Sequence, residues 1–159
     1  MGGGAGTVGR ETFVSRQGAT AEALEREGMD ALVRNFESSP TRRSFRLKDP
    51  RGWDEFVGYV REHSATACAH LVRGVMLRRP TVTQLEPRLR ELRVPTLIVV
   101  GDEDEPCVEP SLMMRQIIPG AGLLVVPRTG HTVNLEEPGL FNLHVAEFLA
   151  AVEQNRWVP

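Results

Sequence analysis

The sequence predicts an α/β fold in which a short parallel sheet segment, ordered strand–helix–strand–helix (βαβα), follows a series of amphipathic helices. Two short aliphatic runs, Val94–Gly101 and Leu123–Pro127, lack the polar alternation of a half-exposed strand. Each is followed by a loop and then by apolar residues at helical spacing. We therefore expect two neighbouring strands, buried on both faces and joined by a right-handed crossover.

Composition excludes several classes of partner. The 159 residues are 41% hydrophobic and 25% charged, with a formal net charge of −2. This balance indicates one globular domain without the basic surface that binds nucleic acid or an anionic membrane. No apolar run approaches the roughly 20 residues that span a bilayer. Cys68 and Cys107 form no C-x-x-C pair, so we expect a protein of the reducing cytoplasm.

Residues 1–18 are expected to be a flexible glycine-rich leader. Gly4–Gly9 matches the pattern G-x-G-x-x-G of a nucleotide-binding loop. That pattern has meaning only between a strand and a helix. No strand precedes it here, which favours a leader or a severed loop and no bound cofactor.

Residues 19–83 are expected to form a helical region with one apolar face. We expect one helix over residues 20–37 and a second helical stretch from Pro50 to Arg79. The inward positions are predicted to be Leu24, Met29, Leu32, Val33, Phe36, Trp53, Phe56, Val57, Val60, Cys68, Leu71, Val72, Val75 and Met76. The basic cluster Arg42, Arg43, Arg46 and Lys48 between the two is interpreted as a solvated loop rather than a phosphate or carboxylate contact. His63 and His70 have no third metal ligand nearby and are expected on the surface or in the core.

Residues 84–159 are expected to form the sheet segment. A polar helix over 84–92 precedes the first strand, and a helix over Pro110–Ile118 separates the two strands. A last helix begins at Pro138. Its inward face is predicted to be Phe141, Val145, Phe148, Leu149 and Val152, with His144 in a packing or surface position.

Polar residues follow both predicted strands. The first strand ends at Gly101-Asp102-Glu103-Asp104, and the second leads into Arg128-Thr129-Gly130-His131. Functional sites of open α/β sheets form beyond the carboxyl ends of the strands. An acidic residue and His131 are therefore expected to meet, with the carboxylate orienting an imidazole that serves as general base. The alternative is that both loops are only turns.

The stretch Leu89–Val152 resembles the C-terminal part of the α/β-hydrolase superfamily. The matching segments read VPTLIVVGDEDEP, IIPGAGLLVVPRTGH and HTVNLEEPGLFNLHVAEFL. In that family G-x-x-D presents the acid of a catalytic triad, which the resemblance assigns to Asp104 rather than to Asp102 or Glu103. A P-x-x-G-H loop presents the histidine, which it assigns to His131. The order acid then histidine agrees with the family.

The resemblance also implies a function. It implies a serine-type hydrolase of esters or similar apolar acyl substrates, without metal or organic cofactor. The helices of 19–83 resemble, more weakly, the cap that covers the pocket in this family.

The family's nucleophile motif is missing from the 159 residues. None of the six serines, Ser15, Ser38, Ser39, Ser44, Ser64 and Ser111, lies in G-x-S-x-G, and neither cysteine fits that turn. We therefore expect this chain alone to be inactive. Two strands do not make an independently stable sheet, so we also expect a marginal fold that self-associates through an exposed sheet edge. The alternative to an enzyme part is an inactive remnant or a domain that binds a ligand or partner.

Overall fold

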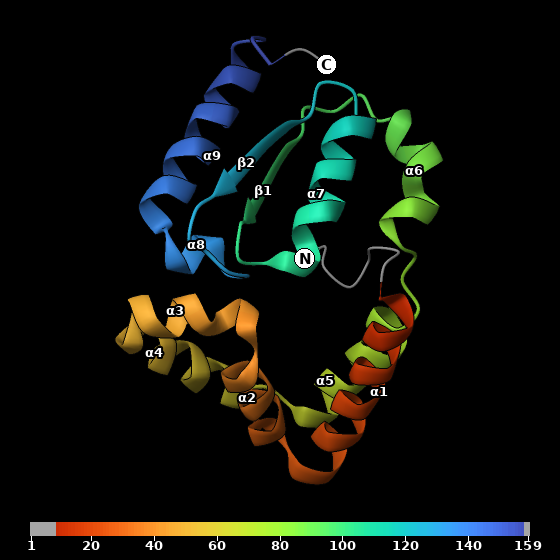
Figure 1. Cartoon of the computed structure of the whole chain (residues 1–159), viewed down its shortest axis with the longest axis vertical. Coiled ribbons are helices and arrows are strands. Elements are labelled where there is room, and N and C mark those ends of the chain that lie inside the picture. The colour runs from red at the N-terminus through yellow and green to blue at the C-terminus, as the bar shows by residue number, and fades with distance from the viewer. Residues whose placement is uncertain (1–8, 158–159) are drawn as a thin grey trace.

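The computed structural model describes residues 9–157. Figure 1 shows two parts, a helical part from Arg10 to Met76 and an α/β part from Val82 to Trp157. Both strands run with their carboxyl ends toward the helical part (Figure 1). The predicted βαβα order is confirmed, and with it the α/β class.

The helical part is built from short helices packed on one another. They are α1 (Arg10–Glu27), α2 (Met29–Ser38), the 3₁₀ turn η2 (Pro40–Arg42), α3 (Arg43–Lys48), α4 (Pro50–Arg61), α5 (Ala65–Leu71) and the π-helical turn η3 (Val72–Met76). Their core contains Leu24, Val33, Phe45 and Trp53, each at most 5% exposed. Phe45 meets Trp53 edge to face at 5.6 Å between ring centroids. Burial of these apolar side chains stabilises the helical part, and the aromatic pair adds a favourable edge-to-face contact.

The N-terminal boundaries differ from the prediction. Residues 10–18, assigned to the leader, form the first half of α1, while the Gly4–Gly9 pattern lies almost wholly outside the described residues. The helix expected over 20–37 is two helices. Gly28 separates them with φ +73°, a left-handed conformation that glycine adopts at low cost, and its N–H closes α1 on the Leu24 carbonyl.

Two of the predicted inward positions are wrong. Leu71 and Val75 are 56% and 49% exposed, while Ala69 and Val72 are buried against α1. The π-helical turn at Val72 adds a residue to the helical turn, which rotates the apolar stripe away from a regular 3.6-residue period. His63 and His70 are exposed, as expected.

The α/β part contains α6 (Val82–Arg90), β1 (Leu97–Gly101), α7 (Glu105–Ile117), β2 (Gly122–Val126), α8 (Val133–Glu136) and α9 (Pro138–Glu153). β1 and β2 are parallel, with Leu97 opposite Gly122 and Gly101 opposite Val126. A small core of Ile98, Ile117, Ile118 and Ala121 lies between the strands and α7 and extends to α6 through Leu89. The two strands therefore end side by side, as the sequence predicts.

The helix between the strands begins earlier than expected. α7 starts at Glu105, with Pro106 in its first turn and Pro110 inside it. Proline fits the first turn because the N–H it lacks would have no helical partner there. The sequence offers two prolines for this role, and the prediction chose the wrong one.

The second strand and the last helix are less covered than expected. In β2 only Val126 is buried, and Val125 is 44% exposed, so β2 is not buried on both faces within residues 9–157. No side chain of α9 is fully buried among these residues, and Leu149, predicted to face inward, is 52% exposed. The described residues contain no further layer that would cover these faces. The turn α8 was not predicted.

The two parts meet at η2, α3 and the loops that follow the strands. Lys48 pairs with Glu137 at 2.5 Å, and Ser44 donates to the Glu103 carboxylate. The basic segment is thus a helix in contact with the α/β part, and the interpretation as a solvated loop is wrong for Arg42 and Lys48. Within residues 9–157, no helix is long and apolar enough to cross a bilayer.

Candidate active site

The two loops beyond the strands are bound to each other by their backbones. The Asp102 N–H donates to the Val126 carbonyl at 3.0 Å, and the Glu103 N–H donates to the Thr129 carbonyl at 2.9 Å. A Cβ atom on Gly101 would lie 2.1 Å from the Thr129 carbonyl oxygen, so only glycine allows this approach. The strand-end glycine therefore brings the acidic loop against the histidine loop.

Asp104 and His131 meet at this edge. Nδ1 of His131 lies 2.7 Å from Oδ2 of Asp104. An ionised carboxylate only accepts hydrogen bonds, so Nδ1 carries the proton and Nε2 is left unprotonated in the neutral ring. Asp104 is 5% exposed, whereas the His131 side chain is 31% exposed. The acid is thus buried behind an imidazole that reaches solvent.

The three neighbouring acids make different contacts. Oδ1 of Asp102 accepts the Thr129 N–H at 3.2 Å, and Glu103 contacts Ser44 of the helical part. Asp104, at the N-terminus of α7, is the one of the three that contacts His131. The structure thus brings together the two residues that the family motifs single out.

Asp104 remains ionised although it is buried. Burial acts to raise its pKa, but the hydrogen bonds from His131 and Cys107 and the charge of His131 outweigh burial, so the pKa of Asp104 lies below its usual value. A carboxylate that is charged at neutral pH stabilises an imidazolium beside it.

Sequence reasoning missed Cys107. It is buried in the first turn of α7, and its Sγ lies 3.9 Å from Nδ1 of His131. Asp104, Cys107 and His131 offer three donor atoms within 4.8 Å of one another, a set that suits a thiophilic divalent cation. In the structure, however, Oδ2 and Nδ1 are directly hydrogen-bonded, which is the arrangement of an acid–base pair.

Glu136 was also missed. It is 7% exposed, and its carboxylate accepts the Gly130 N–H at 2.8 Å and the Thr132 N–H at 3.1 Å. These two amides flank His131, so Glu136 holds the histidine loop from both sides. An acidic residue after the histidine, in His131–Glu136, was the available signal.

The helical part also holds the histidine loop. The Thr41 carbonyl accepts the His131 N–H at 2.8 Å. A cavity of about 260 Å³ opens beside the pair and runs along β1. Its polar lining is Asp104, Cys107, Ser111 and His131.

This arrangement, with an acid after one parallel strand and a histidine after the next, defines the class of the protein. The sequence profile of the alpha/beta hydrolase family matches residues 2–142, and the chain belongs to this family. The C-terminal α/β-hydrolase architecture predicted from the sequence is thereby confirmed.

Individual relatives agree with the family. The chain is 28% identical over 144 residues to a Bacillus subtilis (strain 168) protein named as a 2-succinyl-6-hydroxy-2,4-cyclohexadiene-1-carboxylate synthase, covering 90% of this chain and 52% of that protein. MenH from S. aureus superimposes with a TM-score of 0.78 at 26% identity, covering 87% of this chain and 52% of MenH. A malate-bound thermophilic esterase from Thermogutta terrifontis superimposes with a TM-score of 0.75 at 26% identity, covering 89% and 51%. The chain spans about half the length of these relatives.

Proposed function

We propose that this chain supplies the acid and the general base of an α/β-hydrolase active site that acts on esters or similar acyl substrates. The observation that carries the proposal is the 2.7 Å contact between Asp104 and His131 at the carboxyl ends of two parallel strands. The similarity to an esterase and to a carboxylate synthase supports hydrolase-fold chemistry without selecting the substrate.

The proposed roles follow from the geometry. His131 takes the proton of an attacking hydroxyl at Nε2 and returns it to the leaving group. Asp104 fixes the ring through Nδ1 and stabilises the imidazolium. Because the pKa of Asp104 is lowered, the carboxylate is charged throughout the neutral range.

The nucleophile is not assigned to any residue of this chain. Ser111 lies in the cavity with His131, but it is inside the helix α7 and not in a G-x-S-x-G turn. In the family, a sharp turn between strand and helix exposes the hydroxyl of the serine to the substrate and to the histidine. We therefore propose that the chain alone does not turn over esters.

A chimera tests the proposed roles. The corresponding half of the T. terrifontis esterase is replaced with this chain, and hydrolysis of p-nitrophenyl butyrate is measured. We expect activity that falls about 10³-fold or more in His131→Asn and Asp104→Asn. His144→Asn, in α9 and away from the pair, is the matched control and should retain activity. Full activity in His131→Asn would contradict the proposal.

The isolated chain gives a second readout that does not depend on the chimera folding. A strongly downfield proton on Nδ1 of His131 is expected in its NMR spectrum, and Asp104→Asn should remove or shift it. The absence of such a proton in the folded wild-type chain would refute the acid–base pair.

A binding role without catalysis is the second candidate. It is favoured by the missing nucleophile motif together with the cavity beside β1. Saturable thermal stabilisation of the protein by an acyl compound, with no reaction of any of its serines with a fluorophosphonate, would favour this binding role over catalysis.

A further inference from the structure

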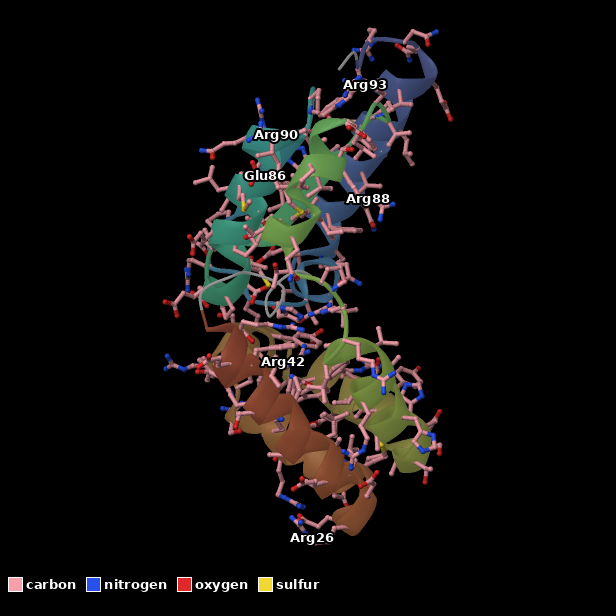
Figure 2. All side chains as sticks on the ribbon, turned by 90° about the vertical axis from the view of Figure 1, so that its right-hand side faces the viewer. Arg26, Arg42, Glu86, Arg88, Arg90 and Arg93 are labelled. Carbon is pink, nitrogen blue, oxygen red and sulfur yellow. The ribbon has the colours of Figure 1, made fainter. Side chains whose placement is uncertain are left out.

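Arg42 lies at the junction between the two parts of the molecule (Figure 2). It is the last residue of η2, directly after Thr41, whose carbonyl accepts the His131 N–H. The segment that holds the histidine loop in place thus also places a guanidinium beside the candidate site.

Two aromatic rings hold this guanidinium. Its Cζ lies 4.2 Å from the ring centroid of Phe36 and 5.6 Å from that of Phe56. The two rings are themselves stacked at 5.8 Å, and Phe56 packs on the buried Phe45. Stacking on a ring face fixes the plane of a guanidinium and leaves its N–H donors at the rim.

These donors are not all used by the described residues. Nη1 of Arg42 is buried and has no hydrogen-bond partner in residues 9–157, and Arg42 forms no ion pair within that range. A buried charged donor without a partner costs free energy. Two other cations of the basic cluster do have partners within the described residues. Lys48 is paired with Glu137, and Arg46 donates to the Glu37 carbonyl.

The nearby carboxylates do not supply the missing hydrogen-bond partner of Arg42. Burial lowers the pKa of Arg42, and the charges of Asp104 and Glu136 raise it without offsetting the burial. Asp104 is already bonded to His131, and Glu136 to the amides that flank it. Arg42 is therefore a desolvated, oriented cation within electrostatic range of Asp104 and Glu136, with donor capacity left over.

We propose that Arg42 binds a carboxylate group of the ligand, so that the site takes anionic acyl compounds rather than the wholly apolar esters expected from the family resemblance. The planar guanidinium suits the two oxygens of a carboxylate, and a low-dielectric setting strengthens the contact. The inference builds on the proposed function, because it names the substrate class of the same site.

Binding to the isolated chain tests the inference without requiring catalysis. The probes are monomethyl succinate, which carries an ester and a carboxylate, and methyl succinamate, its neutral isostere. Affinities are measured by titration calorimetry, and the His131 amide is followed by NMR. We expect the carboxylate to bind about tenfold or more tightly than the amide, and this preference to weaken with added salt.

Variants assign the preference to Arg42. Arg42→Gln should abolish the preference, and Arg42→Lys should keep only part of it, because an ammonium lacks the planar pair of donors. Arg43→Gln, the adjacent exposed arginine on α3, is the matched control and should match the wild type. Should Arg42→Gln fail to fold, the inference is still tested by the preference of the wild type for the carboxylate probe and by the partial loss of that preference in Arg42→Lys. Equal affinities for the two probes, or equal losses in Arg42→Gln and Arg43→Gln, would overturn the inference.

The result also separates this inference from the proposed function. If the isolated chain shows a carboxylate preference that depends on Arg42, while hydrolysis by the chimera does not need His131, the inference stands and the hydrolase roles are refuted. Hydrolysis that needs Asp104 and His131 but shows no carboxylate preference would refute the inference alone.

Discussion

Asp104 is the residue whose charge state links the site to the stability of the chain. Its folded-state pKa is lowered, so its stabilisation is present above the unfolded value near 3.8 and is lost as the pH falls through the lower folded value. We expect Asp104→Asn to lower the free energy of unfolding by about 1–3 kcal/mol at pH 7. The difference in unfolding free energy between this variant and the wild type should begin to narrow below about pH 4 and go on narrowing as the pH falls.

Urea unfolding between pH 7 and pH 3 measures this effect. Asp54→Asn, an exposed position on α4, is the control and should follow the wild type at every pH. A difference in unfolding free energy between Asp104→Asn and the wild type that stays constant down to pH 3 would mean that the fold does not stabilise the charged form of this carboxylate.

Glu136 is the second residue whose replacement should be informative. Glu136→Gln keeps the shape but removes the charge from a buried group that accepts two backbone N–H groups and the Thr132 hydroxyl. We expect a loss of about 2 kcal/mol in urea unfolding, because hydrogen bonds to charged groups contribute more than neutral ones. Glu153→Gln, exposed at the end of α9, should be neutral. Equal stability of the two variants would show that Glu136 does not hold the loop.

At the scale of elements, the approach of η2 to the histidine loop depends on a glycine. A Cβ atom on Gly130 would lie 2.1 Å from the Thr41 carbonyl oxygen. Gly130→Ala must therefore move backbone, and we expect a loss of about 1–3 kcal/mol together with a shift of the His131 amide signal. Gly58→Ala, in the interior of α4 with open space around it, should instead stabilise by about 0.5–1 kcal/mol. If Gly130→Ala leaves the stability unchanged, η2 and the histidine loop do not approach each other closely at Gly130.

The elements that sequence predicts well are those with one dominant local signal. Both strands and the loops that carry Asp104 and His131 follow from aliphatic runs that end in glycine or proline. The break at Gly28 and the start of α7 at Glu105 were missed, because a glycine inside a helical pattern and two prolines in series each allow two interpretations. Choosing between them requires the packing of the finished fold.

The contacts that convert these loops into a site were beyond sequence reasoning for another reason. Thr41 and Arg42 lie far from His131 in the chain, and nothing local in a basic segment distinguishes a solvated turn from a docked one. Cys107 was likewise considered only as a disulfide partner or a nucleophile, although its place in the first turn of α7 puts it beside Asp104. Family motifs identified the pair, and only the structure shows what holds it.

At the scale of the whole molecule, the described residues leave apolar surface uncovered in the α/β part. Val125 on β2 is 44% exposed, Leu140, Leu143 and Leu149 on α9 are 42%, 52% and 52% exposed, and the sheet has only two strands within residues 9–157. The helical part has a core of its own. Uncovered sheet faces and strand edges favour association between copies.

We therefore predict that the isolated chain associates with itself through the α/β part. Sedimentation velocity over a concentration series should show a mean mass that rises with concentration. Val125→Lys should shift the series toward the monomer, because a charge on the exposed face of β2 must be desolvated in the assembly. Tyr59→Lys, on α4 and 65% exposed, makes the matched change on the helical part and should leave association unchanged. A wild-type chain that stays monomeric at every concentration would contradict the prediction, and equal effects of the two variants would place the contact elsewhere.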